Sequence, residues 1–177
     1  MDILSSEQRR RCMSSVHSEN TSPERVLRSG LWHRGFRYRI NDKRLPGSPD
    51  IVLPKYRSVI FVHGCFWHGH KGCKYYTVPK TNTDFWVAKV ARNRERDQKN
   101  WRQLEAKGWH VIVVWACQLK KANLDNAIVS IIAELKTNRE KYETEQDERK
   151  KARKRYLLSQ KVIKEKERAI LHEIKRS

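Results

Sequence analysis

The stretch FVHGCFWHGHKGC, residues 61–73, limits the possible folds of this chain more than any other segment. It contains two cysteines, three histidines and an adjacent Phe-Trp pair. It overlaps the end of SVIFV (58–62), a β-branched run typical of a buried strand. Soft metal ligands, imidazoles and large rings are therefore crowded into one short loop. We expect a metal-binding loop that is anchored at the edge of a sheet.

The spacing of cysteine and histidine in this loop predicts a zinc site. Cys65, His70 and Cys73 form the pattern C-x4-H-x2-C, and Cys117 follows a second apolar run, WHVIVVW (109–115). Three thiolates and one imidazole satisfy tetrahedral Zn²⁺, whose structural sites have four protein ligands. Cys117 would then tie the loop to the sheet.

Other assignments of these ligands remain open. His68 competes with His70, and Cys12 could replace one of the thiolates. Without a metal, Cys117 would be an ordinary small buried residue and His70 a surface histidine. The four cysteines are expected to be thiols or metal ligands, because disulfides are rare in a reducing cytosol.

The charge balance points to a polyanionic partner. Lys and Arg number 39 against 20 Asp and Glu, which gives a formal net charge of +19 at pH 7. Nucleic acid is the expected partner, and a ribosomal or merely soluble basic protein is the alternative. We find no apolar run that approaches the ~20 residues of a membrane-spanning helix and no signal peptide, so we expect an intracellular protein without a membrane role.

Hydrophobic periodicity predicts an α/β protein, with helices packed over a central mixed β-sheet. The expected order is two helices, three strands, a helix, a strand and a helix. The helices lie within residues 5–16, 21–36, 83–107 and from 123 or 125 onward, and the strands lie within 36–40, 50–53, 58–62 and 109–115.

Capping residues and apolar spacing define these helices more closely. Ser5 or Ser6 is the expected cap of the first helix, and Ser22 is the expected N-cap of the second, with Pro23 at its first position. The third helix is expected to begin with Thr83 as its cap and to end at Gly108. Its core side is expected to carry Phe85, Trp86, Val90, Trp101 and Leu104.

The segments DIVL and SVIFV, joined by PKYR, form the pattern of an antiparallel hairpin. With a turn centred on Lys55 and Tyr56, residues whose numbers sum to about 111 lie opposite each other, so Asp50 faces Phe61. Opposed side chains share a face of the sheet, and His63 is then on the Asp50 face. A slip of one residue would reverse this placement.

Asp50 is the candidate ligand for catalytic Mg²⁺. It begins a strand after Pro49, where its carboxylate can protrude at the sheet edge, and Mg²⁺ favours carboxylate, carbonyl, phosphate and water oxygens. Glu24, His63 and His68 are further candidates, since an imidazole can take a proton from attacking water. The alternatives are structural: a strand-edge Asp50, a first-turn Glu24 favoured by the helix dipole, and a structural His63.

Phe66 and Trp67 lie in a polar, Gly-flanked part of the loop. They are equally compatible with a buried core pair and with stacking on or between bases. Met13, on the basic first helix, is either a core anchor or a wedge.

Together, these segments resemble the very short patch repair (Vsr) family of DNA mismatch endonucleases. The resemblance spans roughly residues 5–136. It rests on the order of six segments: RRCMSSV, PERVLR, LPGSPDIV, VIFVHGCFWHGH, DFWVAKVARNRERD and GWHVIVVWAC.

This resemblance implies a restriction-endonuclease-like fold in which Asp50 and the main-chain carbonyl of Val62 bind Mg²⁺. His68 would be the general base, while Glu24 and His63 would hold metal-bound waters. Cys65, His70, Cys73 and Cys117 would bind structural zinc, and Phe66, Trp67 and Met13 would form the DNA wedge. The implied reaction is a nick 5′ to the thymine of a T·G mismatch in double-stranded DNA, which starts repair of deaminated 5-methylcytosine.

The same resemblance implies a cytoplasmic, nucleoid-associated prokaryotic enzyme, with mismatch-repair proteins as further partners. A monomer fits an enzyme that cuts one strand. Two rival functions remain: a restriction-type nuclease that cuts a specific duplex, and a zinc-stabilised DNA-binding module without catalysis.

The sequence also departs from the family pattern. Position 62 is Val, where members of the family usually have Thr. The zinc loop has an additional residue before Cys73. Residues 1–136 are expected to form the endonuclease domain, and residues 137–177 a charged C-terminal extension that is helical or partly disordered. The extension is expected to be a solvated helix, with a grip on DNA phosphate or on a repair partner as the alternative.

Overall fold

The computed structural model describes residues 5–14 and 19–174. The element order is α1 (Ser6–Ser14), α2 (Ser22–His33), β1 (Arg39–Ile40), β2 (Ile51–Leu53), the 3₁₀ turn η1 (Pro54–Tyr56), β3 (Ser58–His63), α3 (Thr83–Ala106), β4 (His110–Trp115) and α4 (Leu124–Ile174). The expected order of helices and strands is confirmed.

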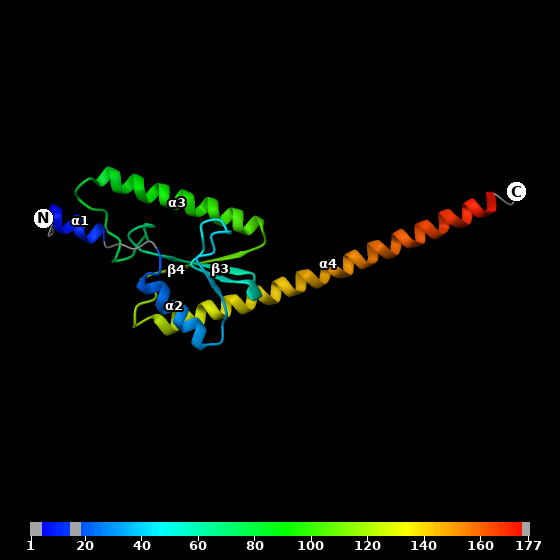
Figure 1. Ribbon diagram of the computed structural model, residues 1–177, viewed down its shortest axis with the longest axis horizontal. Helices are drawn as coiled ribbons and strands as arrows, with labels where there is room; N and C mark the ends of the chain where they lie inside the picture. Colours follow the sequence, from blue (N-terminus) through cyan, green and yellow to red (C-terminus); the bar gives the residue numbers. More distant parts are fainter. Residues whose placement is uncertain (1–4, 15–18, 175–177) are drawn as a thin grey trace. The chain divides into compact units, whose positions relative to one another are not determined.

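The four strands form one mixed sheet in the order β1-β2-β3-β4. β1, β2 and β3 pair antiparallel, whereas β4 pairs parallel to β3. A parallel pair needs a long connection, and α3 supplies it between β3 and β4 (Figure 1). The mixed α/β sheet predicted from the sequence is therefore present.

Helices cover both faces of this sheet (Figure 1). On one face, α2 and the first turns of α4 bury the larger core, which includes Leu27, Leu31, Ile51, Ile60, Ile112, Ile128 and Leu135. On the other face, α3 covers a smaller core of Val52, Val59, Phe61 and Leu104, with Trp101 packed against it. The alternation along β2 and β3 sends successive side chains to these two cores.

The register of the β2–β3 hairpin agrees with the sequence prediction. Ile51 pairs with Ile60, and Leu53 pairs with Ser58, so paired numbers sum to 111. Asp50, which immediately precedes β2, therefore lies toward the α3 face with Phe61 and His63. All three side chains line the same cleft.

The helix caps differ by one residue from two of the predictions. Thr21, and not Ser22, is the N-cap of α2, and Asn82, and not Thr83, is the N-cap of α3. At α2, the Glu24 carboxylate reaches back to accept hydrogen bonds from the N–H groups of Thr21 and Asn20. Ser5, one of the two expected caps, immediately precedes α1, and its hydroxyl accepts a hydrogen bond from the N–H of Gln8.

Three further predictions about the elements were wrong in part. Phe85 is 55% exposed and lies outside the core. The predicted strand at 36–40 contains only two strand residues, Arg39 and Ile40. The apolar run WHVIVVW, which predicts a buried strand, forms β4, an edge strand that is fully buried only at Ile112 and Val114.

The chain separates into two compact units, Met1–Asn138 and Arg139–Ser177. In the first unit, the side-chain amide of Asn138 donates hydrogen bonds to the Tyr56 carbonyl and the Ser58 hydroxyl. The second unit is helical up to Ile174. Within the residues that the structure describes, no helix is long and apolar enough to cross a lipid bilayer.

Candidate active site and metal centre

A cleft of about 810 Å³ opens where β2 and β3 meet the start of α2 and the middle of α3. The four residues predicted to be catalytic all line it: Glu24, Asp50, His63 and His68. Asp97 of α3 lines it too, together with the cations Lys89 and Arg96. The structure thus brings the predicted residues together, between basic side chains that suit an anionic substrate.

Asp50 is held by the backbone of the neighbouring strand. The N–H of Val62 donates a hydrogen bond of 2.7 Å to Oδ2 of Asp50. Burial raises the pKa of Asp50 to about 6, and the nearby Glu24 carboxylate adds to this rise against the opposing Val62 hydrogen bond. A carboxylate with a raised pKa in a desolvated cleft is one that a cation would stabilise.

The carbonyl of Val62 is the second predicted Mg²⁺ ligand. If the hairpin register is extended past Ile51, Pro49 stands opposite Val62. Proline has no N–H, so it cannot donate a ladder hydrogen bond to that carbonyl. The Val62 N–H already bonds to Asp50, and the C=O of a strand residue points the same way as its N–H. Asp50 and the Val62 carbonyl are therefore chemically suited to hold a hard divalent cation.

Glu24 is buried and already has several partners. Its carboxylate accepts hydrogen bonds from the Thr21 hydroxyl at 2.6 Å and from the Arg28 guanidinium at 3.2 Å, in addition to the two N–H groups at the cap. Glu24 therefore lies in the first turn of α2 and caps its N-terminus. Because Glu24 also lines the cleft, this cap fixes a negative charge beside Asp50.

His68 forms the shortest side-chain contact in the cleft. Its Nδ1 lies 2.5 Å from Oδ2 of Asp97, and its ring stacks on that of His63 with centroids 3.7 Å apart. With Nδ1 bonded to a carboxylate, Nε2 is the nitrogen left to exchange a proton with a substrate or water. Desolvation and the neighbouring His68 lower the pKa of His63 to about 4, so His63 is neutral at pH 7.

Asp97 was not among the predicted site residues. Burial raises its pKa, but the hydrogen bond from His68 and the charge of that histidine outweigh this effect, and the net pKa is lowered. The sequence did carry a signal for it. Val90, Asn93, Asp97, Trp101 and Leu104 recur every three or four residues, which puts two polar residues on the apolar stripe of α3. A polar residue on an apolar stripe therefore indicates a candidate site residue.

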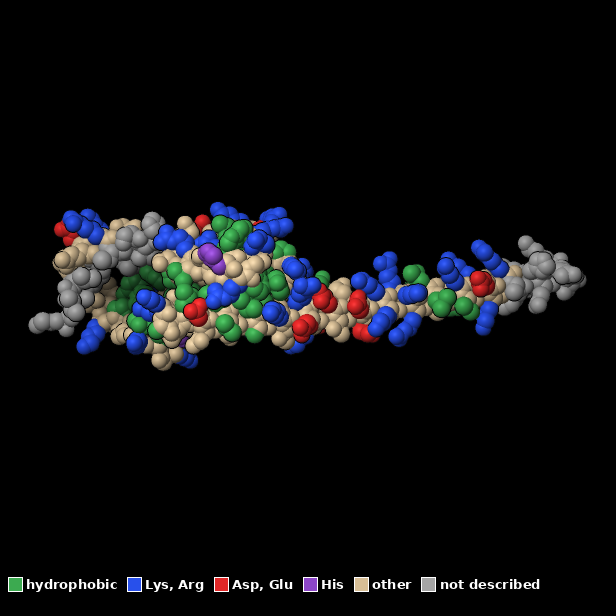
Figure 2. All heavy atoms as spheres, turned by 90° about the horizontal axis from the view of Figure 1, so that it is seen from below, with side chains coloured by type: hydrophobic (Ala, Val, Ile, Leu, Met, Phe, Trp, Pro, Cys, Tyr) green, Lys and Arg blue, Asp and Glu red, His purple; other side chains and the backbone are tan. Residues whose placement is uncertain are grey.

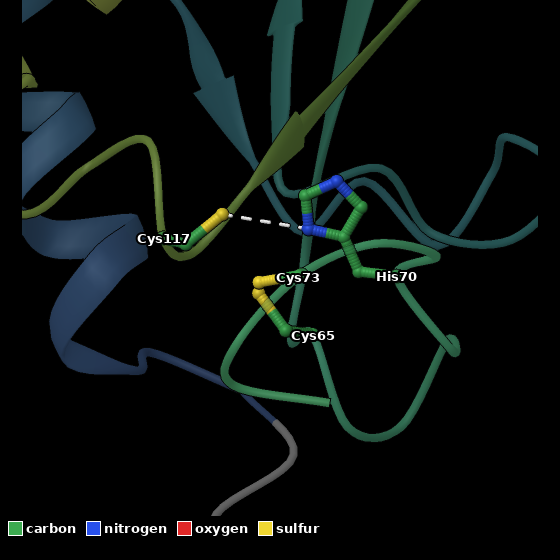
Figure 3. Close-up of side chains that lie close together, drawn as sticks. All are labelled: Cys65, His70, Cys73 and Cys117. Atoms are coloured by element: carbon green, nitrogen blue, oxygen red, sulfur yellow. Dashed lines mark hydrogen bonds between the residues drawn. The ribbon is translucent and has the colours of Figure 1, made fainter. Parts of the chain in front are cut away.

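Cys65, His70, Cys73 and Cys117 converge at the end of β4 (Figure 3). One ligand atom from each lies within 4.8 Å of all the others, and Nδ1 of His70 is 3.4 Å from Sγ of Cys117. The His70 ring is stacked on Trp115 with centroids 4.0 Å apart. His70, and not His68, therefore joins the three cysteines. Cys12 is a residue whose side chain the structure does not describe.

The chemistry of this donor set fits a bound cation. Burial raises the pKa of the Cys117 thiol to about 12, and the adjacent Cys65 and Cys73 contribute to this rise. The pKa of Cys73 is lowered, chiefly by a hydrogen bond from the backbone N–H of Tyr75. Three sulfur atoms this close cannot all ionise without a cation between them. Zn²⁺ satisfies three thiolates and an imidazole.

Phe66 and Trp67 lie in a cluster of aromatic rings. Their centroids are 5.2 Å apart, and Trp86 of α3 lies 5.1 Å from Phe66 and 6.0 Å from Trp67. All three are partly exposed, so Trp86 belongs with this cluster more than with the core where it was expected. The side chain of Met13, the third predicted wedge residue, lies outside the part of the chain that the structure describes.

The raised pKa of Asp50 leads to a prediction about stability. A carboxyl group whose pKa rises from 3.8 to about 6 on folding binds more protons in the folded state, so its contribution to stability falls as the pH rises through this range. At pH 7 without Mg²⁺, Asp50→Asn should therefore raise the free energy of unfolding by about 1–3 kcal/mol. Thermal unfolding of both proteins at pH 7 and pH 4 measures this.

The gain in Tm should be present at pH 7 and nearly absent at pH 4. The introduced amide keeps an oxygen that can accept the Val62 N–H, so the comparison isolates the charge. The matched control is Asp84→Asn, which removes an exposed carboxylate from the first turn of α3 and should not raise the Tm. A Tm for Asp50→Asn below that of the unaltered protein at pH 7 would contradict the prediction.

Several known proteins are similar to this chain. The family model described as "DNA mismatch endonuclease Vsr" matches residues 1–74. The type II nicking enzyme V.NmeAIP of Neisseria meningitidis is 49% identical over 136 residues, which cover 76% of this chain and 96% of that protein. V.XorIIP of Xanthomonas oryzae pv. oryzae, also named a type II nicking enzyme, is 52% identical over 118 residues, 67% of this chain and 86% of its own length.

The DNA mismatch endonuclease Vsr of Escherichia coli is 41% identical over 119 residues, which cover 67% of this chain and 76% of that enzyme. These matches extend well beyond the residues of the cleft. The chain is a DNA endonuclease and belongs to the Vsr family.

Proposed function

We propose that this protein is a Mg²⁺-dependent mismatch endonuclease that nicks one strand 5′ to the thymine of a T·G mismatch. The nick would start very short patch repair of deaminated 5-methylcytosine. The observation that carries the proposal is that one loop supplies both the aromatic pair Phe66-Trp67 and the imidazole of His68, which lines the same cleft as Asp50. Recognition of the mismatch and hydrolysis of the phosphodiester bond would thus occur next to each other.

Asp50 and the Val62 carbonyl would hold Mg²⁺, which supplies charge neutralisation at the scissile phosphate when bound. The protein's own residues perform the proton chemistry. His68 accepts a proton from water through Nε2, and Asp97 keeps the ring in the required tautomer and stabilises the imidazolium that results. Glu24 and the neutral His63 are placed to orient water in the same cleft.

Phe66 and Trp67 would enter the duplex beside the mismatch. Unstacking a base step costs a few kcal/mol, and less at a mismatch than at a matched pair. Met13 would act from the first helix. The same proposal includes a restriction-endonuclease-like fold for residues 1–136, a monomer, DNA at the prokaryotic nucleoid as substrate, and mismatch-repair proteins as further partners.

The experiment that tests the activity uses labelled duplexes that differ in one base pair. With Mg²⁺, a duplex with T·G should be nicked on the thymine strand, and the same duplex with T·A should stay intact. Equal cutting of both would indicate a restriction-type nuclease. Binding without cleavage would indicate a DNA-binding module, and either result would refute the mismatch specificity.

Asp50→Ala should lower the rate of nicking by about a thousandfold or more, because the Mg²⁺ ligand is lost. DNA binding and zinc content should persist. Asp84→Ala, which removes an exposed carboxylate from α3, is its matched control and should nick normally. Nicking by Asp50→Ala would show that the carboxylate has been misassigned.

We also propose that Cys65, His70, Cys73 and Cys117 bind one structural zinc ion. Atomic absorption on purified protein should find about one equivalent of zinc per chain. Cys117→Ser should lower both the zinc content and the Tm, because the ligand that connects the loop to β4 is lost. Cys12→Ser should keep full zinc, and a folded, zinc-free unaltered protein would refute the site.

A further inference from the structure

The second compact unit carries a dense basic segment that the proposed active site does not use. Residues 149–168 contain ten Lys or Arg and two Glu. All ten cationic side chains are exposed. Figure 2 shows the Lys and Arg side chains spread along this helix, with few acidic ones among them. The segment is therefore a concentrated positive surface.

The helical conformation distributes these charges along and around the helix axis, because successive residues point about 100° apart. Arg149 and Arg168 are separated by about 30 Å at the rise of an α-helix. Phosphates follow one another at about 3.4 Å along the axis of each DNA strand. The basic segment is thus long enough to extend along several consecutive phosphates of one DNA strand.

Ion pairs within the helix leave most of the positive charge available. Lys150 and Lys151 pair with Asp147 at 3.4 Å and Glu148 at 3.0 Å, and exposed pairs of this kind contribute little. Arg153, Lys154 and Arg155 make no ion pair with any other residue that the structure describes. These three adjacent cations are the centre of the positive surface.

A second copy of the chain is a poor occupant for this surface. Tyr156 and Leu158 are each 63% exposed, and an apolar contact between two copies at these residues would bring two sets of ten cations together. Like charges in contact repel, whereas a polyanion gains from the same arrangement. Charge complementarity therefore favours nucleic acid.

We infer that residues 149–168 bind the phosphate backbone of duplex DNA outside the cleft, without reading its sequence. This inference rests on the proposed DNA-cleaving function. It goes beyond that function because none of the residues of this segment lines the cleft. The basic segment would raise the affinity for any duplex and leave the choice of the nicked strand to the cleft.

The test uses the full chain with Arg153→Gln, Lys154→Gln and Arg155→Gln combined. Gln keeps a high helix propensity, so far-UV circular dichroism should be unchanged. Duplex affinity is measured between about 50 and 200 mM salt. Loss of phosphate contacts should reduce the slope of log K against log salt by about 0.9 per contact, thus by about 1–3, and weaken binding at the lowest salt by about tenfold or more.

The matched control is the charge-conserving set Arg153→Lys, Lys154→Arg and Arg155→Lys, which should keep the slope. Single-turnover nicking of the T·G duplex at saturating enzyme should be the same in all three proteins. An unchanged slope and affinity in the Gln variant would overturn the inference. An unaltered protein that neither binds nor nicks duplex DNA would instead overturn the proposed function.

Helix α3 also holds the loop that connects the aromatic pair to the metal ligands. The side-chain amide of Asn93 donates a hydrogen bond of 2.9 Å to the Trp67 carbonyl. The next residue, Arg94, donates from Nε to the His68 carbonyl at 3.0 Å and from Nη2 to the Gly69 carbonyl. Two adjacent helix residues thus bind three consecutive loop carbonyls.

The loop fits this contact closely at Gly69. Gly69 has φ +63°, in the left-handed region, and a Cβ there would lie 2.6 Å from Cγ1 of Val90. Only a residue without a side chain lets the loop backbone approach α3 far enough for both bonds of Arg94. The contact therefore depends on the local sequence of the loop as well as on Arg94.

From this contact we infer that Arg94 is a positioning residue for the proposed general base. Its two bonds fix the carbonyls of His68 and of the following residue, so that the His68 ring is set at a constant distance from Asp97 and the cleft. Without these two hydrogen bonds, the His68 ring would have to be placed beside the substrate anew in each turnover, which would slow the reaction. The inference rests on the proposed nicking activity and concerns the rate of nicking more than the affinity.

Arg94→Ala and Arg92→Ala provide a matched pair. Each removes one cation from α3, and Arg92 is exposed, so the loss of electrostatic affinity for DNA should be similar. Only Arg94→Ala should slow single-turnover nicking at saturating enzyme, by about tenfold or more. Arg94→Lys, which keeps the charge and can reach one carbonyl, should recover part of the rate.

Equal nicking rates in Arg94→Ala and Arg92→Ala would overturn the positioning role. If Arg94→Ala does not fold, the comparison is made between Arg94→Lys and Arg92→Lys, and equal rates in this pair would also overturn it. Failure of the unaltered protein to nick would count against the proposed function and not against the role of Arg94.

Discussion

The pairing register of β2 and β3 is the constraint on which the rest of the site depends. With Ile51 opposite Ile60, Asp50 falls on the α3 side of the sheet, beside Phe61 and His63. A shift of one residue would turn Asp50 toward the larger apolar core. The register is fixed because the side chains on each face of β2 and β3 pack into a different apolar core. A shift by one residue would move each side chain to the opposite face and would lower the free energy of unfolding by several kcal/mol.

Helix α3 gives the loop a rigidity that the loop itself lacks. Residues 64–73 contain no strand or helix, so their order depends on contacts from outside. α3 supplies hydrogen bonds to three consecutive carbonyls and the carboxylate that holds the His68 ring. The convergence of Cys65, His70 and Cys73 with Cys117 connects the other end of the loop to β4. Both ends of one short loop are therefore tied to regular elements.

Local patterns in the sequence were sufficient to predict the hairpin, because β-branched runs and a short turn determine its register. They were also sufficient for the four cysteine and histidine residues, whose types and spacing suit only a few kinds of site. They were not sufficient for Asp97, Trp86 and Phe85. Periodicity places Asp97 on the inner stripe of α3. The contact of that stripe with His68, and the exposure of Phe85 and Trp86, depend on how α3 crosses the sheet, which is a tertiary property. The caps at Thr21 and Asn82 differ by one residue because neighbouring polar residues compete for the same position.

Rigidity of the loop has an energetic consequence for the proposed recognition of a mismatch. The difference in unstacking cost between a mismatched and a matched step is at most a few kcal/mol. Ordering one backbone residue costs about 1–2 kcal/mol, so a loop of this length that became ordered only on DNA would spend more free energy on its own ordering than the mismatch offers. A loop already fixed by α3 and β4 avoids that cost. In the proposed function, the small difference between the two duplexes would then decide whether Phe66 and Trp67 enter, and the cleft with Asp50 and His68 would meet the phosphate only where they do.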